Sequence, residues 1–172
     1  MIMKKALLVI DLQNDYLWES RKKQFTYDTK NLIESVNALI NEYDTNGCDV
    51  IYIEHNIQNL WTNRLIFGHS IAGTEGAKLY SGLKIVSTNH FIKLFPDAFS
   101  CKKFKDFVKQ NKYETVTICG LDEGGCVSAT AKGAVKNGLS VEMLTTGIAT
   151  KFPATKIEKL RKELTAKGVK YL

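Results

Sequence analysis

Short apolar runs alternate along this chain with segments in which apolar and polar positions recur at helical spacing. Largely apolar or β-branched runs lie at residues 6–10, 50–53, 115–119 and 139–144, and a less uniform one lies at 90–94. Runs of this kind are typical of strands that are buried on both faces. Because helical patterns separate them, we expect a parallel sheet with helices on both sides.

The expected helices have recognisable starts and ends. Asp28 can cap the first helix and Gly47 can end it. Pro153 and Gly168 bracket the last helix in a similar way. Further helices are expected after residue 101 and after Cys126. Between residues 56 and 82 the periodicity is weak, and we expect loops with one short helix near residues 76–80.

The composition is that of one ordinary globular domain over residues 1–172. Apolar residues make up 44% and charged residues 24% of the chain, and the length suffices for a substantial core. No apolar stretch approaches the length of a membrane span, and the first residues lead into a strand rather than a secretory leader. The four cysteines show no paired spacing. We therefore expect a cytoplasmic protein with reduced thiols and no membrane partner.

Positive charge is in excess, with a formal net charge of +6. The lysines are scattered over the polar faces of the expected helices, and glutamates such as Glu158 and Glu163 are interleaved with them. No basic stripe with interleaved aromatic residues accompanies them, nor does any nucleic-acid-binding signature. We therefore expect solvated helix faces and no nucleic-acid partner.

Three residues with reactive side chains lie where expected strands end. Asp11 follows the first strand, Lys93 falls at the end of the third, and Cys126 comes shortly after the fourth. The carboxyl ends of parallel strands share one edge of the sheet, and this edge carries the chemistry in such folds. Structural interpretations remain open, because Asp11 could cap the next turn and Lys93 could pair with Asp97.

Cys126 stands in the most informative stretch of the chain, where a β-branched strand is followed by a glycine-rich turn and a small-residue helical segment. A thiol at a helix N-terminus faces unpaired N–H groups and the positive end of the helix dipole, so we expect a lowered pKa. The same N–H groups could stabilise an oxyanion on an attacked carbonyl. This arrangement suits a nucleophile, and the alternative is a cysteine buried in the core.

Three segments in this order resemble the isochorismatase-like cysteine hydrolase family, which includes nicotinamidases and N-carbamoylsarcosine amidohydrolases. They are Leu-Val-Ile-Asp-Leu-Gln-Asn-Asp-Tyr at 8–16, the segment 93–99, and Cys-Gly-Leu-Asp-Glu-Gly-Gly-Cys-Val at 119–127. The resemblance covers nearly the whole chain. It implies a Rossmann-like α/β fold, a three-layer α/β/α sandwich with a mostly parallel six-stranded sheet.

By the same resemblance, Asp11, Lys93 and Cys126 form a catalytic triad. A cis peptide bond is implied between Leu121 and Asp122, which leaves the N–H groups of Asp122 and Cys126 to form an oxyanion hole. Asp11 would take the Cys126 proton, the thiolate would attack an amide-type carbonyl, and water would hydrolyse the thioester. The expected function is a cysteine hydrolase that acts on a small amide or ureido compound.

Other functions remain open on the same scaffold, because a fold does not fix a reaction. An isochorismatase-type vinyl-ether hydrolase and a nicotinamidase are the enzymatic alternatives, and a noncatalytic binding protein is a further one. A dinucleotide-binding oxidoreductase is excluded, since acids follow the first strand where a glycine-rich phosphate loop would stand. The resemblance implies a homodimer or a larger homo-oligomer, with a small molecule as substrate.

Nicotinamidases of this family bind a divalent metal through an acid and two histidines. Here Asn56 and Gln58 stand at two of these positions, and only His69 matches. Neutral amide oxygens are weak ligands for zinc or iron, so we expect no metal cofactor, with His69 as a weak candidate ligand. A shifted set of Glu54, His55 and His69 is the alternative, although adjacent strand residues point to opposite faces.

The substrate pocket has three candidate residues. Tyr16 and Trp61 lie in segments that could line it, and His55 follows the second strand. Exposed or core positions explain the aromatic residues almost as well. No arginine is clearly placed to bind a substrate carboxylate.

Overall fold

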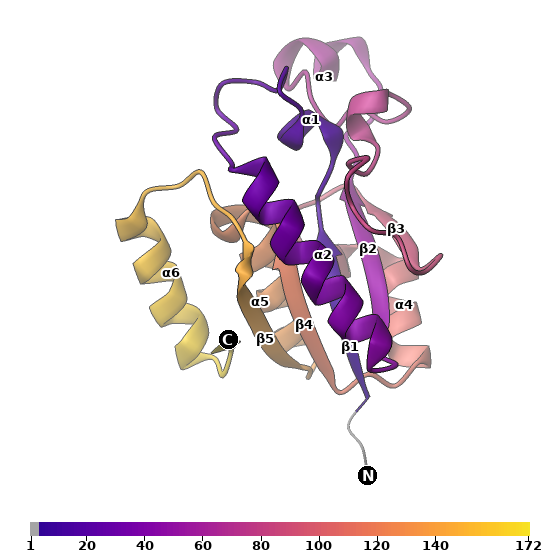
Figure 1. The fold of residues 1–172 in the computed structure, drawn as a ribbon, viewed down its shortest axis with the longest axis vertical. Coiled ribbons are helices and arrows are strands. Elements are labelled where there is room, and N and C mark those ends of the chain that lie inside the picture. The colour runs from indigo at the N-terminus through magenta and orange to yellow at the C-terminus, as the bar shows by residue number, and fades with distance from the viewer. Residues whose placement is uncertain (1–3) are drawn as a thin grey trace.

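Six parallel strands form one sheet in the computed structural model of the protein, which describes residues 4–172. The chain begins in the middle of the sheet, fills one half and then fills the other, in the order β3-β2-β1-β4-β5-β6 (Figure 1). The strands are β1 (Lys5–Ile10), β2 (Asp49–His55), β3 (His90–Lys93), β4 (Thr115–Gly120), β5 (Ser140–Ile148) and β6 (Lys170–Tyr171). The expected α/β fold is confirmed, and the sheet is parallel throughout.

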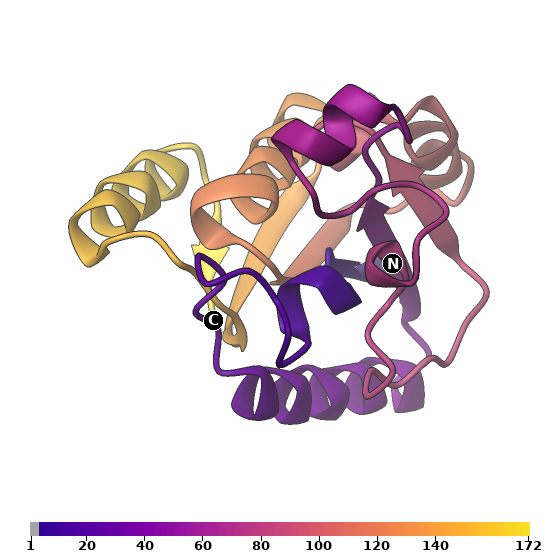
Figure 2. The same cartoon turned by 90° about the horizontal axis from the view of Figure 1, so that it is seen from above.

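Helices cover both faces of this sheet, which gives the three layers seen in Figures 1 and 2. One face carries α2 (Thr29–Thr45), and the other carries α4 (Lys102–Gln110), α5 (Ser128–Lys136) and α6 (Ala154–Ala166). The short helices α1 (Asn14–Leu17) and α3 (Trp61–Ile66) lie beyond the carboxyl ends of the strands, at the top of Figure 1.

The central strand β1 shows why its sequence is apolar without interruption. Leu7 and Val9 pack in the core under α2, whereas Ala6, Leu8 and Ile10 pack in the core on the side of α4 and α5. Because successive side chains of a strand point to opposite faces, a strand between two helical layers needs apolar residues at every position.

The helix boundaries of α2 agree with the sequence-based expectation. The Asp28 side chain accepts a hydrogen bond from the Asn31 N–H at 3.1 Å, and Gly47 follows the helix with φ of +70°. This left-handed conformation after the last turn is one that glycine adopts at little cost. The last helix starts after Pro153 and is followed by Gly168 with φ of +87°.

Three expectations about the elements are wrong. The fifth strand extends to Ile148 rather than to residue 144. The weakly periodic segment forms its helix at 61–66, whereas Glu75–Ala77 form only a 3-10 turn. Cys126 does not open an α-helix, because it lies in a π-helical turn, Glu123–Val127, that precedes α5. Within residues 4–172, no helix combines the length and the apolar character needed to cross a bilayer.

Candidate active site

The ends of β1 and β4 approach each other closely because of Gly120. A side-chain carbon at this position would lie 2.1 Å from the main-chain oxygen of Ile10, and Gly120 has φ of +114°. The next residue, Leu121, donates its N–H to the same Ile10 oxygen at 2.9 Å. Only glycine fits this contact, which places the chain after β4 next to the chain after β1.

Asp11 is the first residue beyond β1, and it is buried with 2% of its surface exposed. Its φ of +52° is a left-handed conformation that is uncommon for residues other than glycine. Its N–H donates to the Ile53 carbonyl at 2.8 Å, so the neighbouring strand β2 holds this turn of the backbone in place. Such a conformation persists where the surroundings determine it, and it is frequent at functional sites.

Lys93, the last residue of β3, donates its ammonium to Asp11 Oδ2 at 2.9 Å. Both side chains are almost fully buried, so each charge depends on the other. The pairing of Lys93 with Asp97 that remained open from the sequence is not formed. Asp97 instead caps a 3-10 turn by accepting the Phe99 N–H at 2.8 Å.

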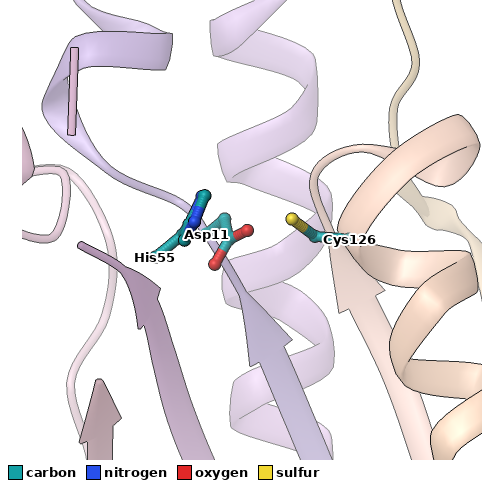
Figure 3. Close-up of side chains that lie close together, drawn as sticks. All are labelled: Asp11, His55 and Cys126. Atoms are coloured by element: carbon teal, nitrogen blue, oxygen red, sulfur yellow. The ribbon is translucent and has the colours of Figure 1, made fainter. Parts of the chain in front are cut away.

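The Cys126 sulfur lies beside this ion pair. A ring nitrogen of His55, a carboxylate oxygen of Asp11 and the Cys126 sulfur all lie within 4.8 Å of one another. Figure 3 shows the Asp11 carboxylate between the His55 ring and the sulfur. The structure thus brings Asp11, Lys93 and Cys126 together at the carboxyl ends of the strands.

The pKa of the Cys126 thiol is raised to about 12, contrary to the expected lowering. Burial is the largest cause, the Asp11 carboxylate adds to it, and the Lys93 ammonium opposes it. The expectation rested on a thiol at the start of an α-helix, whereas Cys126 lies in a π-helical turn where desolvation disfavours the thiolate. Ionisation of Cys126 at neutral pH therefore requires a base next to it.

The turn before Cys126 contains the cis peptide bond between Leu121 and Asp122. The Asp122 side chain does not belong to the group formed by Asp11, His55 and Cys126. Each of its carboxylate oxygens accepts two hydrogen bonds. Its two oxygens accept the Gly124 N–H, the Thr150 hydroxyl, the Tyr27 hydroxyl and the Lys151 N–H, all at 2.8–2.9 Å. The Asp122 N–H has no acceptor within residues 4–172, so it is available to a bound oxyanion.

A cavity of about 180 Å³ opens beside the thiol. Tyr16 and His69 lie on its wall, but Trp61 does not, because it stands at the start of α3 with 74% of its surface exposed. None of the α3 side chains is buried, so this helix cannot contribute to a closed wall. His55 lines a neighbouring cavity of about 390 Å³ with Leu94, although its ring lies near Asp11.

Four wall residues were not identified from the sequence. They are Phe25, Tyr27, Lys151 and Phe152. Lys151 and Phe152 come shortly after β5, which ends at Ile148. With the strand extended to this residue, the rule that strand ends carry the site would have predicted both. Phe25 and Tyr27 lie in the segment between α1 and α2, where no sequence pattern distinguishes them.

Two of the possible metal ligands, Glu54 and Asn56, form other contacts here. Glu54 pairs with His90 at 3.1 Å and accepts the Leu79 N–H, so the shifted set with His55 and His69 does not assemble. Asn56 Oδ1 accepts the Gln13 amide at 3.3 Å.

Within residues 4–172, one group of side chains has the spacing to hold a metal ion, namely Asp11, His55 and Cys126. The Lys93 ammonium occupies one oxygen of this carboxylate and repels a cation there. The set therefore fits a divalent metal poorly. His69 keeps a buried, unpartnered Nδ1 in the described part of the chain, between the rings of Tyr16 and Phe25.

Comparisons with known proteins show the family and the fold of this chain. A sequence model of the isochorismatase domain matches residues 5–168. YddQ of Bacillus subtilis, an uncharacterized isochorismatase family protein, is 25% identical over 149 residues that cover 86% of this chain and 79% of that protein. A protein of Arabidopsis thaliana named a probable inactive nicotinamidase is 28% identical over 146 residues, with 76% of this chain and 72% of that protein covered.

Solved structures share the fold over 98% of this chain. The pyrazinamidase/nicotinamidase of Streptococcus mutans is matched over its full length with a TM-score of 0.85 and 20% identity. The pyrazinamidase of Pyrococcus horikoshii in complex with zinc is matched over 98% of its length with a TM-score of 0.83 and 22% identity. N-carbamoylsarcosine amidase of Thermoplasma acidophilum is matched over 95% of its length, with a TM-score of 0.80 and 18% identity.

Proposed function

Because the chain belongs to the isochorismatase family, we propose that it is a cysteine-dependent hydrolase that cleaves a small amide or ureido compound through a thioester. The proposed catalytic residues are Asp11, Lys93 and Cys126. The proposed oxyanion hole consists of the N–H groups of Asp122 and Cys126. We expect a small-molecule substrate, since the cavity beside the thiol measures about 180 Å³.

The observation that carries this proposal is the unequal environment of the two Asp11 carboxylate oxygens. Oδ2 accepts the Lys93 ammonium, whereas Oδ1 is buried without a hydrogen-bond partner in the described part of the chain. A purely structural buried carboxylate would have both oxygens satisfied. A carboxylate with one free oxygen within 4.8 Å of a protonated thiol is placed to accept its proton.

In the first half-reaction, Asp11 accepts the Cys126 proton while the sulfur attacks the carbonyl carbon. The new C–S bond places negative charge on the carbonyl oxygen, and the proposed N–H donors stabilise it by roughly 3 kcal/mol each. The C–N bond then breaks, and Asp11 returns the proton to the departing amine. Lys93 stays charged, because Asp11 and Cys126 outweigh the burial that opposes its charge and raise its pKa.

In the second half-reaction, Asp11 acts on water. It accepts a proton from the water that attacks the thioester carbonyl, and the C–S bond breaks to release the acid. The Cys126 sulfur recovers this proton, so the thiol and the carboxylate return to their initial states. One residue therefore serves as base and as acid in turn, which suits its position between the sulfur and the cavity.

We propose that this chemistry proceeds without a metal cofactor. The zinc of the P. horikoshii pyrazinamidase belongs to that protein. Of the candidate ligands here, Asn56 and Gln58 are neutral amides, Glu54 is paired with His90, and Asp11 is paired with Lys93. No step above uses a metal ion.

A noncatalytic binding protein is the second candidate. It is favoured by the raised pKa of Cys126, which leaves the resting thiol protonated, and the A. thaliana relative carries the word inactive in its name. Under this alternative the cavity would still bind a small molecule, and Cys126 would never become acylated.

The test is ammonia release from a panel of small primary amides and ureido compounds, with and without chelator. Acid-quenched samples analysed by mass spectrometry should carry an acyl group on Cys126. Cys126→Ala should abolish both signals, whereas Cys101→Ala, at a half-buried thiol outside the cavity, should retain them. Turnover by Cys126→Ala would overturn the mechanism, loss of activity with chelator would overturn the metal-free proposal, and a silent panel without acylation would support the binding protein.

The assembly state and the location follow the same reasoning. Apolar side chains on α3 are exposed, with Trp61 at 74%, Leu65 at 76% and Ile66 at 70%, and such surfaces often mark protein interfaces. We propose a homodimer or a larger homo-oligomer. All four cysteines are free, which supports a reducing, cytoplasmic environment.

A further inference from the structure

Lys151 brings a positive charge to the wall of the cavity beside Cys126. It lies shortly after β5, and its ammonium is 4.8 Å from the centroid of the Phe25 ring and 5.9 Å from that of Phe152. Both rings also line the cavity. Cation–π contacts of this kind favour a defined position for the ammonium over free rotation into solvent.

The main chain of Lys151 is fixed next to the proposed oxyanion hole. Its N–H donates to Asp122 Oδ2 at 2.8 Å, and the preceding Thr150 hydroxyl donates to Asp122 Oδ1 at 2.8 Å. The base of the lysine is therefore attached to the residue whose N–H faces the reacting carbonyl in the proposed reaction.

No carboxylate within residues 4–172 forms an ion pair with the Lys151 ammonium. The two acids of the cavity are committed elsewhere, since Asp11 pairs with Lys93 and Asp122 is saturated by four donors. His69 adds no charge at neutral pH, because burial and the nearby Lys22 lower its pKa to about 4. The ammonium of Lys22 donates to the Phe67 carbonyl. Lys151 is thus the cation of the wall that remains available to a ligand.

We propose that the substrate of this enzyme carries a carboxylate in addition to its amide or ureido group, and that Lys151 determines this specificity by binding the carboxylate. The inference rests on the proposed hydrolase function and defines its substrate class. The cavity is small, at about 180 Å³. The substrate is therefore a short one, such as the monoamide of a three- or four-carbon dicarboxylic acid.

The first test measures the charge preference at the sulfur without any turnover. Iodoacetate and iodoacetamide both alkylate a thiolate with loss of iodide. The first carries a carboxylate, whereas the second carries a neutral carboxamide. We expect Lys151→Met to lower the ratio of their rates at Cys126 by about tenfold, as the loss of one nearby charge in a partly desolvated site predicts. Labelling is followed by peptide mass spectrometry.

Lys156→Met is the matched control. The Lys156 ammonium also lies over the Phe152 ring, at 3.3 Å from its centroid, but Lys156 does not line the cavity. This variant should keep the wild-type ratio. An equal ratio in wild type and Lys151→Met, or an equal fall in both variants, would overturn the assignment of the carboxylate to Lys151.

The second test uses succinamate and succinamide, which differ in the same way and both release ammonia on hydrolysis. The ratio of their kcat/KM values should favour succinamate in wild type and fall by about tenfold in Lys151→Met. If the alkylation ratio depends on Lys151 but neither compound is hydrolysed, the proposed anion site would stand and the proposed hydrolase function would be rejected. Hydrolysis with no dependence on the Lys151 charge would reject only the carboxylate.

Discussion

Two regions meet at the Cys126 sulfur, and they are built in different ways. The strand-end cluster comes from residues at or after the ends of three strands and consists of Asp11, Lys93 and Cys126. Asp11 and Lys93 are almost fully buried, and Cys126 is half-buried. The pocket wall comes mainly from loops and ranges from buried to exposed; it consists of Tyr16, Phe25, Tyr27, His69, Lys151 and Phe152. The sheet thus fixes the groups that would do chemistry, while loops supply recognition.

The two aspartates of the cavity show this difference between the regions. Asp11 has one paired and one unpartnered oxygen, and its backbone is held in a left-handed conformation. Asp122 has no free acceptor capacity toward the cavity, because hydroxyl and N–H groups from several loops converge on it. The first is poised to exchange a proton, whereas the second joins the wall to the turn that carries Cys126.

The largest expected effect comes from breaking the cluster at its charge pair. Asp11→Asn should lower hydrolysis by about 10³-fold, because the base is lost. It should also lower the free energy of unfolding by about 3 kcal/mol, because the buried Lys93 ammonium loses its counter-charge. Urea unfolding and ammonia release measure the two effects independently.

The double variant Asp11→Asn/Lys93→Met separates stability from catalysis. Removing both charges should restore most of the free energy of unfolding, since a buried ion pair contributes little net stability relative to neutral residues of similar size. Activity should remain lost. Unchanged stability of Asp11→Asn would contradict the buried ion pair, and recovered activity in the double variant would contradict the role of Asp11 as base.

Alanine substitutions at two glycines allow the rigidity of the two regions to be compared directly. A methyl group at Gly120 would lie 2.1 Å from the Ile10 main-chain oxygen, whereas one at Gly124 would lie 2.3 Å from a Phe152 ring carbon. Backbone cannot yield, so Gly120→Ala should cost about 3 kcal/mol of stability. A ring can rotate, so Gly124→Ala should cost about 1 kcal/mol and mainly raise KM.

Chemical denaturation and steady-state kinetics of both glycine variants provide the measurement. If Gly124→Ala proved as destabilising as Gly120→Ala, the pocket wall would be as rigid as the strand ends. The distinction drawn between the two regions would then fail.

The sequence predicted the strand-end cluster because its residues follow apolar runs that can be recognised one at a time. Asp11 and Lys93 could be placed by this rule, although only the structure showed them paired with each other. The raised pKa of Cys126 was not predictable, because it depends on how deeply the turn is buried. Packing of distant segments, rather than any local pattern, determines that burial.

The pocket wall was harder to predict, for a related reason. Trp61 looked suitable as an aromatic residue in a weakly patterned segment, but α3 turns every side chain outward from the core. Phe25 and Lys151 are far apart in sequence and meet because α2 begins, and β5 ends, near the same edge of the sheet (Figure 1). Loop residues of this kind have no periodic signal from which their partners could be read.

A smaller effect is expected where the wall is joined to the Cys126 turn. The Tyr27 hydroxyl donates to Asp122 Oδ2 at 2.9 Å, and Tyr27→Phe removes this bond. The variant should lose about 1 kcal/mol of stability and several-fold in kcat, because the N–H of Asp122 is positioned less firmly.

Tyr113→Phe is the matched control, because the Tyr113 hydroxyl donates to Asp49 Oδ2 at 2.5 Å at the opposite end of the sheet. It should lose similar stability with no change in kcat. A fall in kcat of both variants would show that stability alone governs activity, and that Asp122 has no special position.

The smallest expected effect concerns the two histidines whose pKa values move in opposite directions. Burial, together with Lys22, lowers the pKa of His69 in the wall to about 4. Unfolded chains bind a proton at this residue near pH 6.5, so the free energy of unfolding should fall as the pH drops from 6.5 toward 4. The loss should be about 1 kcal/mol, because the half-exposed ring is partly screened by solvent.

His90 should show the reverse dependence. The hydrogen bond from its ring to Glu54 raises its pKa, so its stabilising contribution is complete below pH 6.5 and is lost as the pH rises through the higher folded value. Urea unfolding of His69→Gln and His90→Gln from pH 4.5 to 8 measures both slopes. His69→Gln should be relatively more stable than wild type at acid pH, and His90→Gln relatively less. Parallel stability profiles for the two variants would mean that the wall does not keep His69 neutral.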